Sequence, residues 1–393
     1  MVRVLRGVTL SLLLGPLRVQ PVPAELAEAL LEAQVTVTAG QRSGFQLRFA
    51  LAKGGLLDRE LLPGRTLDPP NRVILVVTVD GTPHVLMDGV ITRHDLAPGN
   101  EAGQSTLTVT GVDVSQMMDL IDLTGLPLPA MPPEARVLLG LAPFAAYGVV
   151  PLVVPSVLLL APNPLTEVPG WQGTTYAYLT RLAEEVGYAF YVEPGAQPGM
   201  NIGYWGPEIR TGQPQPALSV NLDAATNVES LSFSFDGLGK KVYLVLGYIP
   251  QLRLPIPIPV PDISPINPPL GRKLPIPLSY TRINAGRKAA PGGEQGERDG
   301  AVAKWDIIRA TSQALGRAAR SANVIGGSGS LDVLRYGQPL RARRLVAVRG
   351  AGPAYDGEYY VTSVASTLKP GEFKQRFTLS RNAQVSTSET VRP

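Results

Sequence analysis

Side chains able to support catalysis or to bind a metal are few in this sequence. Its 393 residues contain no cysteine and only two histidines, His84 and His94. Cysteine nucleophiles, disulfides, zinc ribbons and three-histidine metal centres are therefore excluded. His94 is followed by Asp95, as in half of an acid–base pair, but no serine or cysteine nucleophile motif accompanies it. We assign no catalytic, cofactor-binding or metal-binding residue, and we expect neither enzyme activity nor a cofactor.

Two polar motifs admit a functional interpretation that we do not favour. Residues 326–330 (GGSGS) come close to a nucleophile elbow but lack its last glycine, and we interpret them as a flexible turn. Arg341, Arg343, Arg344 and Arg349 form a basic patch that could bind phosphate. No aromatic residues are interleaved with them, so a solvated strand face or a salt-bridged subunit contact is favoured.

Trp171, Tyr176 and Tyr178 could form a platform on which sugar rings stack. Aromatic residues at this spacing more often pack inside a core, and we favour that interpretation. The platform, with an apolar N-terminal stretch that follows Arg3 and Arg6 as in a signal peptide, supports an alternative function, that of a secreted β-rich protein that binds cell-wall glycans.

The composition favours a globular β-rich protein. Hydrophobic residues make up 44% of the chain and charged residues 17%, with 41 glycines and 38 prolines. This balance is enough for a core, and it suits strands joined by many turns better than long exposed helices. A net charge of +4 without a long basic run gives no reason to expect specific nucleic-acid binding. The uncharged residues 137–163 are interrupted by prolines, so we expect no membrane insertion.

The pattern of elements predicts an α+β fold with three domains. Residues 1–128 contain alternating strand patterns, among them a hairpin around Asp80 and Gly81, and predict a first barrel or sandwich. Residues 129–215 predict a small α/β domain that includes an amphipathic helix over 176–186.

Residues 216–393 predict a second β-domain with two additions. Prolines alternate with apolar residues over 249–280, which favours an extended, polyproline-like arm that either reaches a neighbouring protein or acts as a spacer. Residues 304–321 predict an amphipathic helix.

One short pattern occurs at both ends of the chain. Leu96-Ala97-Pro98-Gly99 precedes Thr106-Leu107 as Leu368-Lys369-Pro370-Gly371 precedes Thr378-Leu379, with a constant offset of 272 residues. Each copy falls on a predicted hairpin. Either these are two ordinary proline–glycine hairpins, or the chain carries two related β-domains.

The order of several motifs resembles that of phage late control protein D, a family of baseplate hubs of contractile tails. The similar stretches are residues 356–361 (DGEYYV), 371–373 (GEF), 377–382 (FTLSRN), 87–91 (MDGVI), 106–113 (TLTVTGVD), 133–155 and 176–192. They cover most of the chain apart from the proline-rich arm. Each motif is short, so the resemblance depends on their order along the chain.

The resemblance implies a fold and a role. The expected fold is two barrels resembling the tail-tube subunit, with a small α/β domain inserted between them. Such hubs are similar to the hub part of type VI spike proteins. The implied role is structural: a homotrimeric ring in the virion baseplate, assembled in the host cytoplasm, that adapts a sixfold tube to a threefold spike. The particle could be a phage, a tailocin or an injection system.

The resemblance also implies partners. Tail-tube or tube-initiator proteins would dock on one side of the ring, and tape measure and baseplate wedge proteins are further possible partners. The chain ends shortly after the last hairpin, without a spike domain, so a separate spike protein is expected.

Overall fold

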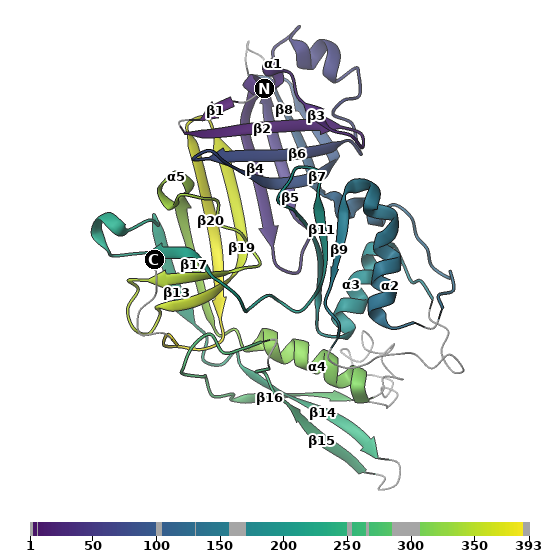
Figure 1. Ribbon diagram of the computed structural model, residues 1–393, viewed down its shortest axis with the longest axis vertical. Helices are drawn as coiled ribbons and strands as arrows, with labels where there is room; N and C mark the ends of the chain where they lie inside the picture. The colour runs from purple at the N-terminus through teal and green to yellow at the C-terminus, as the bar shows by residue number, and fades with distance from the viewer. Residues whose placement is uncertain are drawn as a thin grey trace.

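The protein consists of two β-sheet units, an α/β module and a smaller inserted module (Figure 1). The computed structural model describes residues 3–5, 7–99, 104–129, 131–156, 170–249, 254–264, 267–284 and 307–387. Among them strands outnumber helices, which confirms the β-rich prediction.

The N-terminal sheet unit comprises the first eight strands. They are β1 (Arg3–Leu5), β2 (Val8–Gly15), β3 (Gln20–Pro21), β4 (Leu30–Thr38), β5 (Gly44–Ala50), β6 (Arg72–Val79), β7 (Thr82–Ala97) and β8 (Thr106–Asp113), with helix α1 (Ala24–Ala29) and the helical turn η1 (Leu57–Leu61). The β6–β7 hairpin turns at Asp80 and Gly81, whose φ angles of 47° and 79° are both positive. This is the tight turn expected for Asp-Gly.

The α/β module packs two helices on a three-stranded sheet. Its elements are η2 (Val114–Asp119), α2 (Pro133–Leu141), η3 (Ala142–Tyr147), β9 (Val149–Val153), α3 (Thr175–Glu185), β10 (Ala189–Pro194) and β11 (Asn201–Gly206). Thr174 caps α3, and Gly187, with a φ of 72°, follows its end. The predicted helix–strand order and the pairing of β10 with β11 are confirmed. Val114 and Met118 lie in this module's core although they precede residue 129.

The C-terminal sheet unit is built from strands on both sides of an insertion. They are β12 (Gln215–Ser219), β13 (Ser230–Phe235), β17 (Ile325–Asp332), β18 (Leu345–Arg349), β19 (Gly357–Lys369) and β20 (Glu372–Arg381), with η4 (Asp223–Ala225) and α5 (Val333–Tyr336). The flexible turn expected at residues 326–330 is wrong, because they lie within β17. A Cβ on Gly329 would lie 2.7 Å from the Phe377 ring and one on Gly327 would lie 3.1 Å from the Phe233 ring, so glycine suits this strand.

The inserted module corrects the prediction of a polyproline arm. It comprises β14 (Lys241–Ile249), β15 (Leu254–Val260), β16 (Ser279–Asn284) and α4 (Ile307–Ser321). β15 is an edge strand paired antiparallel with β14. Its prolines occupy every second position, so the N–H groups that they lack would point to the unpaired side, and a proline-rich edge strand can form. Residues 304–306 of the predicted helix lie outside the described residues.

The segment after β15 is bound to the body of the protein. The Leu270 N–H donates to Asn382 Oδ1 at 2.8 Å, and Lys273 pairs with Gln384. Beyond this contact the segment is apolar and exposed: Ile276 is 77% and Leu278 69% accessible. That this segment docks on a neighbouring protein stays a prediction.

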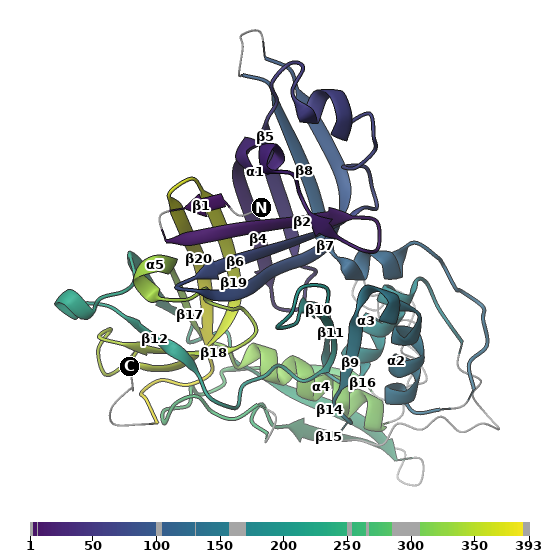
Figure 2. The ribbon, with the colours of Figure 1, turned by 45° about the horizontal axis from the view of Figure 1, so that its top comes forward.

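The two sheet units form a single sheet. Its strand order runs β1-β2-β6-β7-β8-β5-β4-β19-β20-β17-β13, so β4 of the first unit pairs with β19 of the second. Figures 1 and 2 show the yellow strands β19 and β20 continuing the purple and blue N-terminal strands. One apolar core lies under both units. Among the described residues the order is open at both ends and no closed barrel is detected, so the two expected barrels are not confirmed.

A glycine on β8 tests the packing of this sheet. A Cβ at Gly111 would lie 2.3 Å from both the Phe45 ring and the Val90 carbonyl oxygen, so Gly111→Ala forces the backbone to shift. We expect a loss of about 2–3 kcal/mol in the free energy of unfolding, measured by chemical denaturation. Gly44→Ala on neighbouring β5 is the control, because its Cβ would meet nothing closer than 3.8 Å. Equal losses in the two variants would contradict the packing described.

Candidate functional site

The pairing of β4 with β19 is the most distinctive feature of the molecule. The strands are antiparallel, with the pairs Thr38↔Ser363, Val37↔Val364, Thr36↔Ala365, Val35↔Ser366, Gln34↔Thr367 and Ala33↔Leu368. The hydroxyl groups of Thr38 and Ser363 lie 3.1 Å apart across it, and the Ala39 N–H donates to the Thr362 carbonyl at 2.7 Å. Residues more than 300 positions apart thus join the two sheet units through their backbones.

The two units have the same strand order. The N-terminal unit reads β2-β6-β7-β8-β5-β4 across the sheet, and the C-terminal unit reads β12-β18-β19-β20-β17-β13. If these six strands of each unit are numbered along the chain, leaving out β1 and β3, both orders are 1-4-5-6-3-2. The units differ in the first strand, since β12 runs parallel to β18 whereas β2 runs antiparallel to β6.

A threonine bulge marks the same place in both units. The register of β7 with β8 slips at Thr92, and that of β19 with β20 slips at Thr362. Each threonine donates its hydroxyl to the carbonyl of a threonine on the next strand: Thr92 to Thr110 at 3.2 Å and Thr362 to Thr378 at 3.0 Å. The units therefore correspond strand for strand, and Thr92 matches Thr362.

Arg343 is buried where the sheet units meet the α/β module. Its side chain is fully inaccessible, and Nη2 donates to the carbonyls of Thr38 at 3.2 Å and Gln41 at 2.9 Å. The guanidinium lies 4.0 Å from the ring centroid of Tyr191, and Nη1 lies 4.0 Å from Glu193. A buried cation is tolerated only with such partners, so Arg343 fixes the β4–β5 turn and β10 relative to each other.

The β4–β5 turn also contacts the α/β module directly. The Ser43 N–H donates to Asp113 Oδ2 at 2.6 Å; Asp113 ends β8 and caps η2 of the module by accepting from the Ser115 N–H, and burial raises the pKa of its carboxyl. Arg42 forms a 2.7 Å ion pair with Asp119, and its guanidinium lies 3.6 Å from the Tyr176 ring centroid. The β4–β5 turn is thus bound both by Arg343 and by residues of η2 and α3.

A second buried polar cluster fixes the module to β6 and β7. Arg72 forms a bidentate pair with Asp88, with both hydrogen bonds 2.7 Å long. Arg72 also donates to the Tyr147 carbonyl at 2.8 Å, and the Asn201 amide donates to Asp88 at 2.9 Å. Burial raises the pKa of Asp88, and the bonds from Arg72 and Asn201 oppose that effect. The ion pair of Arg72 and Asp88 therefore joins β6 and β7 to η3 and β11 of the α/β module.

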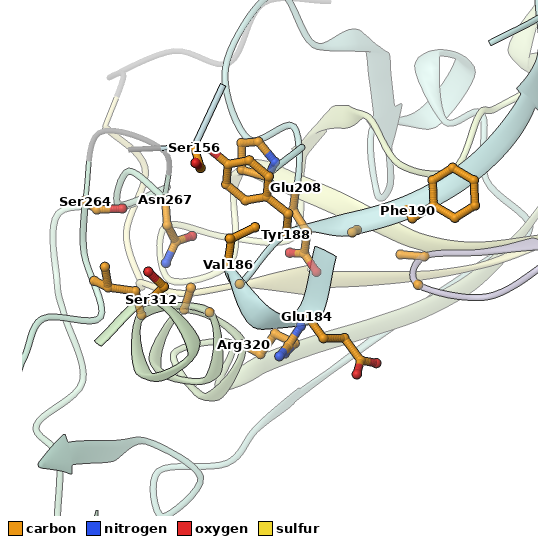
Figure 3. Close-up of a pocket in the computed structure, with 18 of the residues that line it drawn as sticks. Ser156, Glu184, Val186, Tyr188, Phe190, Glu208, Ser264, Asn267, Ser312 and Arg320 are labelled. Carbon is orange, nitrogen blue, oxygen red and sulfur yellow. The ribbon is translucent and has the colours of Figure 1, made fainter. Parts of the chain in front are cut away.

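A cavity of about 450 Å³ lies between the α/β module and the inserted module (Figure 3). Around it lie Tyr188, directly before β10, Asn267 in a loop, and Ser312 on helix α4. At its floor a Cβ on Gly316 would come within 2.4 Å of the Gly187 Cα, so α4 touches the end of α3 closely. Most of its exposed lining is apolar, and Glu184, Glu208 and Arg320 also border it.

The histidines are not brought into a catalytic arrangement. His94 Nδ1 lies 3.3 Å from the Leu67 carbonyl, at the end of the N-terminal unit. His84 lies beside Arg341, and its pKa is lowered first by burial and then by that arginine. No group of three metal-ligating side chains occurs in the part of the chain that the structure describes. Within the same ranges, none of the helices combines the length and apolarity needed to span a bilayer.

The aromatic platform does not exist. Trp171 and Tyr178 are 7% and 2% exposed and pack against each other in the module's core, as the core interpretation predicted. The alternative function of glycan binding therefore loses its main support. The basic patch is divided: Arg341 is exposed, whereas Arg343 is buried and Arg344 forms a 2.5 Å ion pair with Glu193. The expectation of a solvated face is wrong for Arg343.

Sequence reasoning missed the ion pair of Arg72 and Asp88 and the junction residues of β4. The sequence signal for the ion pair was a charged residue at each end of a mostly apolar hairpin. A charge in such a strand needs a buried partner. Nothing in the sequence pairs β4 with β19.

The fold matches those of solved tail proteins. A tail protein from Neisseria meningitidis MC58 is 13% identical with a TM-score of 0.61, over 95% of this chain and 97% of that one. The 43 kDa tail protein of prophage MuSo2 from Shewanella oneidensis is also 13% identical, with a TM-score of 0.59 over 95% and 99%.

A half-lidded PdpA–VgrG complex from Francisella is 8% identical with a TM-score of 0.58, over 100% of this chain and 60% of that one. No protein-family model and no curated protein matches the chain. At these identities the likeness shows the fold: that of phage tail and spike-associated proteins, as the resemblance to baseplate hubs predicted.

Replacing Arg343 by methionine tests whether it holds the three parts together. The variant removes the charged donor shared by the carbonyls of Thr38 and Gln41, and Thr38 keeps only the Gln41 N–H at 3.3 Å, so we expect a loss of about 3 kcal/mol in the free energy of unfolding. Arg341→Met, two residues earlier and exposed, should change it by less than about 0.5 kcal/mol. Urea denaturation measures both, and an unchanged midpoint for Arg343→Met would contradict the role assigned to it.

Proposed function

We propose that the protein is the structural hub of the baseplate of a contractile phage tail or a related injection particle. Its fold is that of phage tail proteins and of a spike-associated complex. Most strands of the described residues join in one long sheet, and the same residues hold no group of three metal-ligating side chains. The hub role accounts for a chain built around one long sheet.

The observation that carries the proposal is the junction of two like-ordered sheet units. The first unit donates the outer edge of β4 to β19 of the second, which is a head-to-tail contact. A head-to-tail contact repeated between copies closes a ring when its rotation allows. Two units per chain in three chains would give six similar units, so the ring would meet a sixfold tube on one face and a threefold spike on the other.

This role sets the partners. We propose a homotrimer that binds tail-tube or tube-initiator proteins on one face and a separate spike protein on the other. Tape measure and baseplate wedge proteins are further partners in this scheme, and assembly in the host cytoplasm precedes incorporation into the virion. The neighbouring solved complex contains a VgrG protein, which supports an arrangement beside a spike. Two tube-like barrels per chain would form only once the open sheet is completed by neighbouring copies.

The mass of the purified chain in solution tests the ring. We expect light scattering to give three times the chain mass of 41.8 kDa, without a dependence on concentration in the range of the experiment. Arg341→Met provides a control for handling, because an exposed substitution should leave the mass unchanged. A homogeneous monomer at every concentration would contradict the proposed function.

A further inference from the structure

We propose that β13 of one copy pairs antiparallel with residues 93–97 of β7 in the next copy, with Phe233 opposite Leu96. This inference rests on the proposed function, because it names the edges through which the ring closes. The partner is a second copy of this chain. The junction inside the chain provides the template for the contact.

The template follows from the correspondence of the two units. Thr92 and Thr362 match at the bulge, so β7 corresponds to β19. Their partners Thr110 and Thr378 align β8 with β20. Thr110 pairs with Gln46 on β5 and Thr378 pairs with Ser328 on β17, so Gln46 matches Ser328. The strand beside β5 is β4 and the strand beside β17 is β13, so β4 matches β13. The resulting equivalences are Gln34 with Ser232, Val35 with Phe233, Thr36 with Ser234, Val37 with Phe235 and Thr38 with Asp236.

Carrying the β4–β19 register over these equivalences gives a unique register between copies. The predicted pairs are Asp236↔Arg93, Phe235↔His94, Ser234↔Asp95, Phe233↔Leu96 and Ser232↔Ala97. The next position would place Leu231 opposite Pro98. Because proline has no N–H to donate, the ladder ends at Ala97.

Both edges are free to pair in the described residues. β13 ends the strand order, and its outer edge has no strand beside it. Residues 82–90 of β7 pair with β6, but no strand pairs with the same side of β7 beyond Ile91, whose N–H bonds to Asn71; the Leu67 carbonyl contacts the His94 side chain there at 3.3 Å. In β19 that equivalent place is filled by β4. Each chain therefore carries two unpaired edges: β13, which is equivalent to β4, and residues 93–97 of β7, which are equivalent to the part of β19 that pairs with β4.

The side chains on these edges are complementary. Leu96 is 52% and Phe235 45% exposed, so pairing between copies would remove apolar surface from water at both edges. The predicted register places both, with Phe233, on one face, where they would cover each other.

The opposite face carries a charge pair. Arg93 lies opposite Asp236, at the position where Thr38 and Ser363 bring their hydroxyl groups within 3.1 Å inside the chain. The Arg93 side chain is 73% exposed and forms an ion pair with Asp95 of its own strand at 2.6 Å. An arginine opposite an aspartate favours this register over one shifted by two residues.

Engineered cysteines test the register, and the wild-type chain offers no competing thiol. Ser232→Cys with Ala97→Cys places two cysteines directly opposite each other in neighbouring copies. Side chains at such a pair reach disulfide distance, whereas diagonal neighbours do not. On oxidation we expect most of the protein to run as a covalent trimer on a non-reducing gel. Ser234→Cys with Ala97→Cys, shifted by two residues, is the matched control and should stay largely uncrosslinked.

The outcomes separate the inference from the proposed function. Cross-linking of the matched pair alone supports both. A trimer by light scattering in which the shifted pair links as well as the matched pair, or neither links, overturns the register and leaves the hub standing. A monomer that never cross-links overturns both.

A charge exchange provides an independent test in the same contact. Arg93→Glu should weaken association of the copies about two- to fivefold at each contact, and Asp236→Arg should do the same, because each places like charges opposite each other. The double variant should recover wild-type association, measured by analytical ultracentrifugation at low salt. Additive weakening in the double variant would contradict the pairing of Arg93 with Asp236.

Discussion

The backbone ladder between β4 and β19 is the interaction on which the rest of the structure depends. The N–H and C=O groups of a strand edge need partners, and an open edge in a large sheet otherwise invites uncontrolled association. Here the edge of one sheet unit is satisfied by the next unit of the same chain. The residual open edges are short, and in the proposed ring they would be used up by neighbouring copies. Covalent connection of two units thus halves the number of contacts that assembly must form.

Buried charge gives this junction a fixed geometry. Backbone pairing alone permits a strand to slip by two residues, because the side-chain faces repeat with that period. Arg343 binds the turn at the end of β4, and the pair of Arg72 and Asp88 binds the α/β module to β6 and β7. Such groups contribute little net stability, but they are costly to misplace. We infer that they set the angle between units, which a closed ring requires to be constant.

Much of the local structure could be predicted from the sequence, and the reasons for the failures are physical. The Asp80–Gly81 hairpin and the helix over 176–186 with the strand that follows it are predicted from turn chemistry and helical periodicity, and both are confirmed. The sequence predicts a turn at the glycine-rich residues 326–330, because the aromatic rings that fill the space beside these glycines belong to strands far away in the sequence. The proline-rich β15 was predicted as an arm because the pattern cannot show that only one of its edges is paired.

The site itself was the least predictable part. The echo at an offset of 272 residues does fall on two hairpins, but the structures correspond at Thr92 and Thr362, an offset of 270, because the paired strands of the second hairpin extend further beyond the bulge and are joined by a shorter loop. The joining of β4 to β19 depends on residues 325 positions apart and leaves no local signal.

Electron microscopy of the assembled chain tests the central claim most directly. The account predicts a closed ring of three copies in which six sheet units continue strand to strand around the axis. Copies that touch only through their α/β or inserted modules, with β13 and the end of β7 unpaired, would contradict it.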